Sequence, residues 1–509
     1  MSEYNSRELT RGTLLARNTI LNITGQVLPM VVAVFAIPLL VKGLGTERFG
    51  LLTLIWAIVG YFSIFDLGLG RALTKLVAEK LASEQSNEIP SLFWTSVSLM
   101  FLLGLVSAAV LAISTPWLVR DVLGISKKLQ PEALLCCYLL AISMPIVIST
   151  MGLSGFLEAH QRFPVINAIR VPMGIFTFIS PLVMLYFYKG LVPVVAILVF
   201  GRLVAWLAYA MSCLTMVPQL RRRIIINYRL VSFLFKFGGW ITVSNTISPV
   251  LLYLDRFLIA ALVSTVAVAY YATPYDLMMR TLIISTAFVG VLFPAFTTSF
   301  TQDRERALKL FMRAIKYIFL LMFPLTFFVI IFAREGLNLW LGAEFATHST
   351  RVLQYLAVGI FANSLAQVPV SLIQGMGRPD LTAKLHLIEL PLYVGFVVLM
   401  IRSFGVEGAA IAWMLRVTID MLFLFTVLRV VLRQDALRLG RAALVFTTAG
   451  LLLVLAFAQL GAALKAMFLM IVFITFVLTA WFRLLAPEER SLIQGWLRLP
   501  SYSQGPEAK

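Results

Sequence analysis

The chain has 509 residues, of which 60% are hydrophobic and only 13% are charged, whereas roughly a quarter of an average soluble domain is charged. Apolar runs of about 20 residues, the length that a helix needs to cross a bilayer, recur from one end of the chain to the other. A soluble protein is therefore excluded, and so is a β-barrel, whose strands need about half that length. The composition predicts an all-α polytopic membrane protein.

The net charge of +18 excludes less than it first suggests. Basic residues accumulate on the cytoplasmic loops of membrane proteins, so the charge does not imply a nucleic-acid partner. The three cysteines lie in apolar runs and the three histidines are scattered, and neither set has the spacing of a metal site or a disulfide framework. We therefore predict no cofactor and no metal site.

In chain order, the hydropathy pattern predicts about fourteen transmembrane helices. Lys and Arg gather in the loops on the side of the first residue, which places both termini in the cytoplasm. The predicted spans are 15–41, 48–72, 91–114, 131–156, 165–188, 191–216, 232–262, 267–298, 310–333, 351–375, 380–401, 406–430, 442–460 and 464–484.

A weak internal repeat relates the two sides of a basic segment that follows the sixth span. Three tie points have nearly equal offsets: Pro29 with Pro249, Arg162 with Arg378, and Gly190 with Gly405. Such a repeat predicts two pseudo-symmetric lobes of six helices each, with substrate bound between them near the midplane. The predicted segments are an N-lobe at 1–217, a basic cytoplasmic linker at 218–231, a C-lobe at 232–432, two further helices at 433–486 and a cytoplasmic tail at 487–509.

Charged residues inside the predicted spans are the candidate functional residues. Each would cost roughly 2.5–3.5 kcal/mol at the centre of a bilayer, so each needs a partner or a water-filled cavity. Most of them lie roughly 14–20 Å along their helices, close to the middle of the membrane. The candidates for a cationic, substrate-binding cavity are Arg170, Arg202, Arg256, Arg280 and Arg416, and those for ion coupling or pairing are Asp255, Asp276, Glu389 and Asp420.

Structural pairing is the main alternative to a ligand role. Asp276 stands four residues before Arg280, which is the favoured orientation of a helical ion pair. Arg416 has two candidate partners, since Glu389 lies at a similar depth on the preceding helix and Asp420 lies one turn further along.

The remaining charged residues suggest two different roles. Arg202 has no acid in its own helix and Arg170 has no local partner, so both favour an anionic cargo, because guanidinium groups match phosphate oxygens. The Asp255–Arg256 pair lies near the end of its predicted helix, where a role at the membrane interface is the first expectation.

Enzymatic chemistry has no support in the sequence. There is no phosphate-binding G-x-x-x-x-G-K-[ST] loop, nucleophile elbow or zinc motif. The longest predicted external loops, around 115–130 and 334–350, are too short to fold as a catalytic domain, which disfavours a membrane glycosyltransferase or polymerase. A transporter is the better class.

Several stretches resemble the polysaccharide-transport flippases, the O-antigen and exopolysaccharide translocases of the multidrug/oligosaccharidyl-lipid/polysaccharide exporter superfamily. The resemblance covers essentially the whole chain. It is carried by N-I-T-G-Q-V-L-P at 22–29, L-G-T-E-R-F-G-L at 44–51, F-D-L-G-L-G at 65–70, L-D-R-F-L-I at 254–259, N-L-W-L-G-A-E-F at 338–345, and Q-G-M-G-R-P-D through L-H-L-I-E-L-P-L-Y at 374–393.

The resemblance implies a two-lobed bundle with a central cationic cavity in a bacterial inner membrane. Such a protein moves a polyprenyl-diphosphate-linked oligosaccharide from the cytoplasmic to the periplasmic leaflet, alongside the polymerase and glycosyltransferases of its pathway. The diphosphate would meet Arg202, Arg280 or Arg416. An ion gradient would supply the energy through an intramembrane acid.

Two rivals share the architecture. A multidrug/cation antiporter commonly binds its coupling ion on an acid of the first helix, and residues 15–41 contain no Asp or Glu. A peptidoglycan lipid-precursor flippase would carry several charges in its first two helices, where this chain has only Asp66 and Arg71, both near one end.

Overall fold

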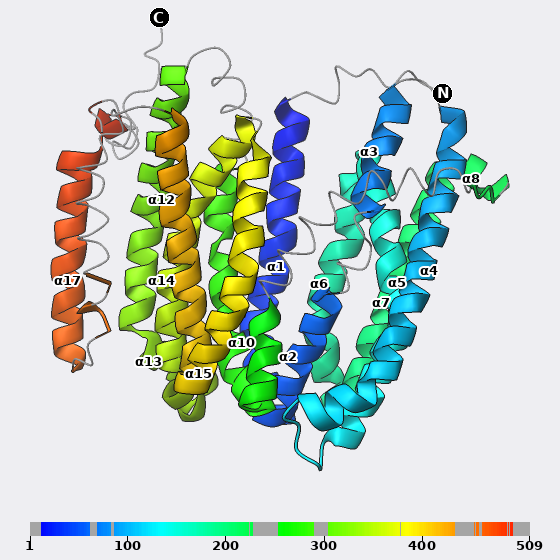
Figure 1. Cartoon of the computed structure of the whole chain (residues 1–509), viewed down its shortest axis with the longest axis horizontal. Helices are drawn as coiled ribbons and strands as arrows, with labels where there is room; N and C mark the ends of the chain where they lie inside the picture. Colours follow the sequence, from blue (N-terminus) through cyan, green and yellow to red (C-terminus); the bar gives the residue numbers. More distant parts are fainter. Residues whose placement is uncertain are drawn as a thin grey trace, which may run out of the picture. The chain divides into compact units, whose positions relative to one another are not determined.

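The computed structural model describes most of the chain, and every regular element in the described residues is helical (Figure 1). Eight of these helical runs are long and apolar enough to cross a membrane, which confirms an all-α multi-pass membrane protein and leaves the number fourteen as a prediction. The described residues are 12–61, 69–82, 86–222, 224–227, 253–289, 304–376, 378–432, 452–453, 455–457, 461–485, 487 and 489–491.

Some predicted features lie wholly or mainly outside these residues. They are the N-terminal end, the helix at 442–460, the first part of the helix at 232–262, the last part of the helix at 267–298 and most of the tail. Residues 223 and 228–231 of the linker are also outside the described part.

The helices follow one another with short connections. In chain order they are α1 (Gly12–Leu44), α2 (Thr46–Tyr61), α3 (Leu69–Ala82), η2 (Ser86–Glu88), α4 (Ile89–Trp117), η3 (Leu118–Val122), α5 (Gln130–Ala159), α6 (Phe163–Phe187), α7 (Leu191–Met216), α8 (Gln219–Arg222), α10 (Thr265–Thr281), α12 (Arg304–Ile331), α13 (Ala333–Leu341), α14 (Ala343–Gly375), α15 (Pro379–Leu432), α17 (Ala462–Thr479) and η4 (Ala480–Leu484). Residues 253–262 are also helical.

Glycine sets one of the predicted helix boundaries. The predicted helices 380–401 and 406–430 correspond to the two parts of α15, which are separated by a break at Gly405 with φ 58° and ψ −135°. Such a backbone conformation is strained for any residue with a Cβ atom. The predicted helix 48–72 corresponds to α2 and the beginning of α3, and residues 62–68 between them lie outside the described part of the chain.

Contacts divide the chain into two compact units. Unit 1 consists of Met1–Arg280, Trp340–Val352 and Ala383–Ala412, and unit 2 of Thr281–Leu339, Leu353–Thr382 and Trp413–Lys509. Unit 1 thus combines the first half of the sequence with shorter segments of the second half. The predicted lobe boundaries stay a prediction.

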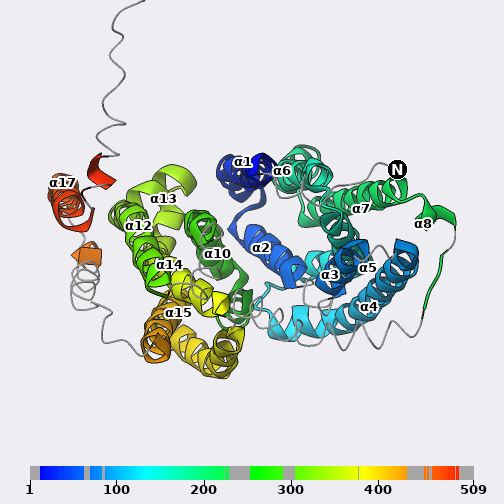
Figure 2. The same ribbon diagram turned by 90° about the horizontal axis from the view of Figure 1, so that it is seen from above.

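Unit 1 is built around α5. This helix packs against α3, α4 and α7, while α1 packs against α6 (Figure 2). Its core contains Phe93 of α4 and Phe156 of α5, whose ring centroids lie 4.7 Å apart. Trp206 of α7 donates an indole hydrogen bond of 2.9 Å to Ser149 Oγ of α5, which fixes the register of the two helices.

Unit 2 has an aromatic core. Phe323 of α12 stacks on Phe476 of α17, with ring centroids 5.2 Å apart, and meets Phe361 of α14 edge to face. Trp413 of α15 is fully buried and lies against Gly359 of α14. These rings supply large contact areas where α12, α14 and the last part of α15 meet.

The chain after η4 is attached to α12 by polar contacts. Lys316 Nζ of α12 donates to both carboxylate oxygens of Glu489 at 2.6 Å, and Tyr317 OH donates to the same carboxylate. Arg490 donates to the main-chain carbonyls of Phe482 and Leu485 at 3.0 and 3.1 Å, which satisfies groups that the end of η4 leaves open.

Gly104 of α4 offers a test of the packing between α4 and α5. A Cβ atom at Gly104 would lie 2.4 Å from Cα of Pro145, so the helices would have to separate. We expect Gly104→Ala to lower the apparent melting temperature of the purified protein. The matched control is Gly395→Ala, where nothing lies within 4 Å of the added atom and alanine favours the helix by about 1 kcal/mol. Equal melting temperatures for the two variants would contradict the packing.

Candidate functional site: a basic cavity and a buried charge network

A cavity of about 380 Å³ lies among α5, α6 and α7 of unit 1, and two predicted site residues line it. Arg202 comes from the middle of α7, roughly 17 Å from its beginning, and Arg170 comes from the first half of α6. The remaining lining residues are Val147, Thr150, Ile169, Met173, Gly174, Thr177, Ala205 and Tyr209. The structure therefore brings together two of the five predicted arginines.

Hydroxyl hydrogens in this cavity are already engaged. Thr150 and Thr177 donate to carbonyl groups one turn earlier in their own helices, at 2.7 and 2.8 Å. Tyr209 donates to the carbonyl oxygen of Ile166 at 3.4 Å. Their remaining lone pairs can only accept, so hydrogen bonds to an anion have to come from the two guanidinium groups.

The two arginines differ in their surroundings. Arg170 forms an ion pair of 3.6 Å with Glu158 of α5, and both side chains are substantially exposed. The expectation that Arg170 has no local partner was therefore wrong, because the turn between α5 and α6 returns Glu158 to its side. Arg202 is half-buried among apolar side chains, and an anion there would meet a guanidinium group that little water screens.

A second group of charges is fully buried in unit 1. The carboxylate of Asp255, on the helix 253–262, accepts hydrogen bonds from Tyr271 OH of α10 at 2.7 Å and from Tyr393 OH of α15 at 2.6 Å. Asp255 and Arg256 are 0% and 2% exposed. The neighbouring helices enclose both residues, which adds a structural role, while the interfacial role first expected for them stays a prediction.

Arg256 is enclosed by groups of its own chain. Its guanidinium group donates to the carboxylate of Asp276 of α10 and lies over the rings of Tyr253 and Tyr275, at 5.4 and 5.5 Å from their centroids. Breaking such a buried pair is strongly destabilising, because it leaves an uncompensated charge. The geometry favours a structural role for Arg256 over contact with cargo.

The structure replaces one of the helical ion pairs expected from spacing. Asp276 pairs with Arg256 instead of Arg280, and the guanidinium group of Arg280 lies 5.7 Å from the centroid of the Phe178 ring. A cation over an aromatic face is favoured by the ring quadrupole. Spacing along one helix could not reveal Arg256, which comes from the preceding helix.

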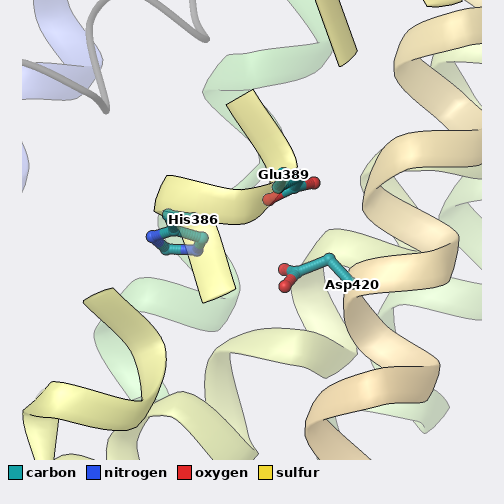
Figure 3. Close-up of side chains that lie close together, drawn as sticks. All are labelled: His386, Glu389 and Asp420. Atoms are coloured by element: carbon teal, nitrogen blue, oxygen red, sulfur yellow. The ribbon is translucent and has the colours of Figure 1, made fainter. Parts of the chain in front are cut away.

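The remaining candidates lie on α15. His386 and Glu389 stand one turn apart on its first part, and Asp420 stands on its last part, one turn after Arg416 (Figure 3). Asp420 Oδ1 is buried without a hydrogen-bond partner, whereas Glu389 and Arg416 both interact with other groups. Their predicted roles in cargo binding and ion coupling stay predictions.

Tyrosine is the functional residue type that sequence reasoning missed. Tyr209 lines the basic cavity, and Tyr271 and Tyr393 hold Asp255. A signal was present in Y-Y-A-T-P-Y at 270–275, where polar aromatic residues recur inside an apolar helix. Buried tyrosine usually finds a hydrogen-bond partner, so these residues could have been matched with the nearby acids.

The arrangement of the helices defines the class of protein. A solved inward-facing multidrug resistance MATE-family transporter of the MOP superfamily is similar to this chain, with a TM-score of 0.68 and 15% sequence identity. The match covers 81% of this chain and 99% of the transporter. The chain thus has the fold of the multidrug/oligosaccharidyl-lipid/polysaccharide (MOP) superfamily.

Sequence comparison identifies the family within that fold. The pattern of the polysaccharide biosynthesis protein family matches residues 15–300. A putative O-antigen transporter of Shigella flexneri is 30% identical over 415 residues, which are 81% of this chain and 96% of that protein. A probable low-salt glycan biosynthesis flippase of Haloferax volcanii is 25% identical over 180 residues, which are 35% of this chain and 38% of that protein.

The chain belongs to the polysaccharide biosynthesis protein family, and the resemblance stated from the sequence is confirmed.

The hydrogen bonds to Asp255 generate a stability prediction. Tyr393→Phe removes one donor to a buried carboxylate and keeps the ring, so we expect a loss of about 1–3 kcal/mol, measured as a lower apparent melting temperature in detergent. Tyr186→Phe is the matched control, because Tyr186 is 87% exposed. The same melting temperature for Tyr393→Phe and the control would contradict the network.

Proposed function

We propose that the protein is a flippase that moves a polyprenyl-diphosphate-linked oligosaccharide across a membrane for cell-surface polysaccharide biosynthesis. The observation that carries this proposal is Arg202, a mid-membrane guanidinium group in a cavity whose hydroxyl hydrogens are already donated elsewhere. The family membership and the name of the Shigella flexneri relative support the same class of cargo. A diphosphate is the anionic part of such a cargo, and guanidinium forks fit its oxygens.

The route follows from the repeat and the charge distribution. We place the protein in a bacterial inner membrane with both termini in the cytoplasm, because basic residues gather in the predicted cytoplasmic loops. The cargo enters from the cytoplasmic leaflet and leaves to the periplasmic leaflet as the lobes alternate access. Glycosyltransferases that build the cargo and a polymerase that consumes it are the partners that this route implies.

Arg202 provides the direct test of the cargo site. The assay uses proteoliposomes that contain a polyprenyl diphosphate carrying a fluorescent oligosaccharide, and a membrane-impermeant quencher reports its translocation. We expect Arg202→Ala to slow translocation roughly 10- to 100-fold, the effect of losing a hydrogen bond between charged groups. Arg202→Lys keeps the charge and loses the fork, so its rate should be intermediate.

The control is Arg334→Ala, an exposed arginine of α13, which should translocate at the wild-type rate. Wild-type translocation by Arg202→Ala would refute the cargo site. Export of a cationic dye without translocation of the oligosaccharide lipid would identify a multidrug/cation antiporter. Translocation of a peptidoglycan lipid precursor alone would identify a peptidoglycan lipid-precursor flippase.

We propose further that an ion gradient drives the cycle through an intramembrane acid. Asp276, Glu389 and Asp420 are the candidates, together with Asp255. Asp255 is the candidate with the most evident structural role, because two tyrosines hold it.

Neutralising the acids one at a time tests this coupling. We expect an uncoupler to slow translocation by the wild-type protein, and one of the variants Asp276→Asn, Glu389→Gln, Asp420→Asn or Asp255→Asn to be slow with or without the uncoupler. Asp380→Asn is the control, since Asp380 pairs with Arg378 on the exposed surface. Translocation that survives both the uncoupler and all four neutralisations would exclude coupling through these acids.

A further inference from the structure

One end of unit 1 brings the two halves of the sequence into close contact. Gly50 of α2 approaches the beginning of α10 so closely that a Cβ atom would lie 1.9 Å from the carbonyl oxygen of Thr265. In the loop after η3, the main-chain N–H of Gly124 donates to the carbonyl oxygen of Ala260 at 2.8 Å. Figure 1 shows the turn between α1 and α2 and the loop after η3 at this same end.

A single carboxylate oxygen also joins the two halves of the sequence at this contact, which we call the seam. Oε1 of Glu344, at the beginning of α14, accepts hydrogen bonds from Thr46 Oγ1 of α2 at 2.9 Å and from Tyr270 OH of α10 at 2.6 Å. Trp340 of α13 adds a hydrogen bond from its indole N–H to the carbonyl oxygen of Val34 in α1. Thr46 and Val34 belong to the first half of the sequence, and the other three residues belong to the second.

Each side of the seam is rigid in itself. On the first side, Arg48 forms two parallel hydrogen bonds of 2.9 Å with the carboxylate of Glu132, and Glu47 accepts from the N–H of Ser126 at 3.3 Å. Such paired geometry is the strong form of an ion pair.

The second side is held around Tyr270. Its carbonyl oxygen accepts from Ser349 Oγ at 2.9 Å, its ring stacks on His348 with centroids 4.6 Å apart, and Phe345 meets it edge to face. These contacts position the phenol of Tyr270 toward Glu344 whether or not the seam is closed.

Contacts within each side of the seam differ in kind from the contacts across it. Ion pairs and ring stacks lie within each side, whereas the contacts that cross between the described residues are van der Waals contacts and single hydrogen bonds from neutral donors. Thr46 and Glu344 are also accessible to water, so separation exchanges their hydrogen bond for one to solvent at small cost. Contacts of this kind suit a seam that opens and closes.

We propose that this end of unit 1 is a gate, closed in the structure, and that Glu344 is its latch. Opening breaks the bonds from Thr46 to Glu344, from Trp340 to Val34 and from Gly124 to Ala260, while the two sides move as rigid bodies. The inference rests on the proposed transport function. It adds the residues that control which end of the protein is open, and the orientation proposed from the charge distribution puts this end on the periplasmic side.

The test measures the opening of the gate in the absence of cargo. Spin labels are attached to Lys42→Cys and Thr347→Cys, two exposed positions on opposite sides of the seam, in full-length protein whose three native cysteines are replaced by serine. Double electron–electron resonance then gives the distance distribution. We expect one short distance for the parent protein and a second, longer population in Thr46→Val, with the open-to-closed ratio raised roughly two- to fivefold for the lost hydrogen bond.

Matched variants separate the latch from general destabilisation. Thr46→Ser keeps the hydroxyl and should retain the parent distribution, and so should Glu88→Gln, which alters an exposed carboxylate of η2 that pairs with Lys80 of α3. The proposal is overturned if Thr46→Val leaves the distribution unchanged, if Thr46→Ser opens the gate as far, or if the parent shows only the long distance. Because the measurement needs no cargo, a failure of the transport assay leaves its result interpretable.

Discussion

Two tyrosine hydroxyl groups donate to the fully buried carboxylate of Asp255, and the segments on either side of that carboxylate depend on the bonds. Residues 253–262, α10 and the first part of α15 meet there, while the adjacent Arg256 joins Asp276. In an apolar protein a charge can be placed at such depth only when hydrogen bonds replace water. The network therefore fixes the position of α10. Because α10 carries Tyr270, the network also fixes the position of the gate.

The contrast between Arg256 and Arg202 separates structural from functional charge. Both lie deep in apolar helices, yet Arg256 is surrounded by an acid and two aromatic rings, and Arg202 opens into a cavity. A guanidinium group that already pairs with an acid has less to offer a ligand, whereas one facing a cavity gains from an anion. The predicted depth of a charged residue in the membrane identifies it as a candidate functional residue. The groups around its side chain indicate whether its role is structural or ligand-binding.

Sequence patterns predicted what depends on local periodicity and missed what depends on long-range contact. The all-α membrane class, the family and the break near Gly405 followed from apolar runs, quoted motifs and a glycine. The ion pair between Asp276 and Arg256 did not follow, because helical spacing offered Arg280 as a nearer partner. Arg170 and Arg202 were predicted to line one cationic cavity together with three other arginines. Which arginines share a cavity could not be predicted, since that depends on how α6 and α7 pack.

The attachment of the C-terminal segment to α12 bears on how the protein can be shortened for study. Glu489 stands close to the last described residue, and its carboxylate satisfies an ammonium group on a transmembrane helix, since the side chains of Lys316 and Glu489 are only 17% and 14% exposed. A truncation placed directly after η4 would leave that ammonium group in an apolar surrounding without its acid. A purification tag should therefore be placed after residue 491, where it leaves the ion pair between Lys316 and Glu489 intact.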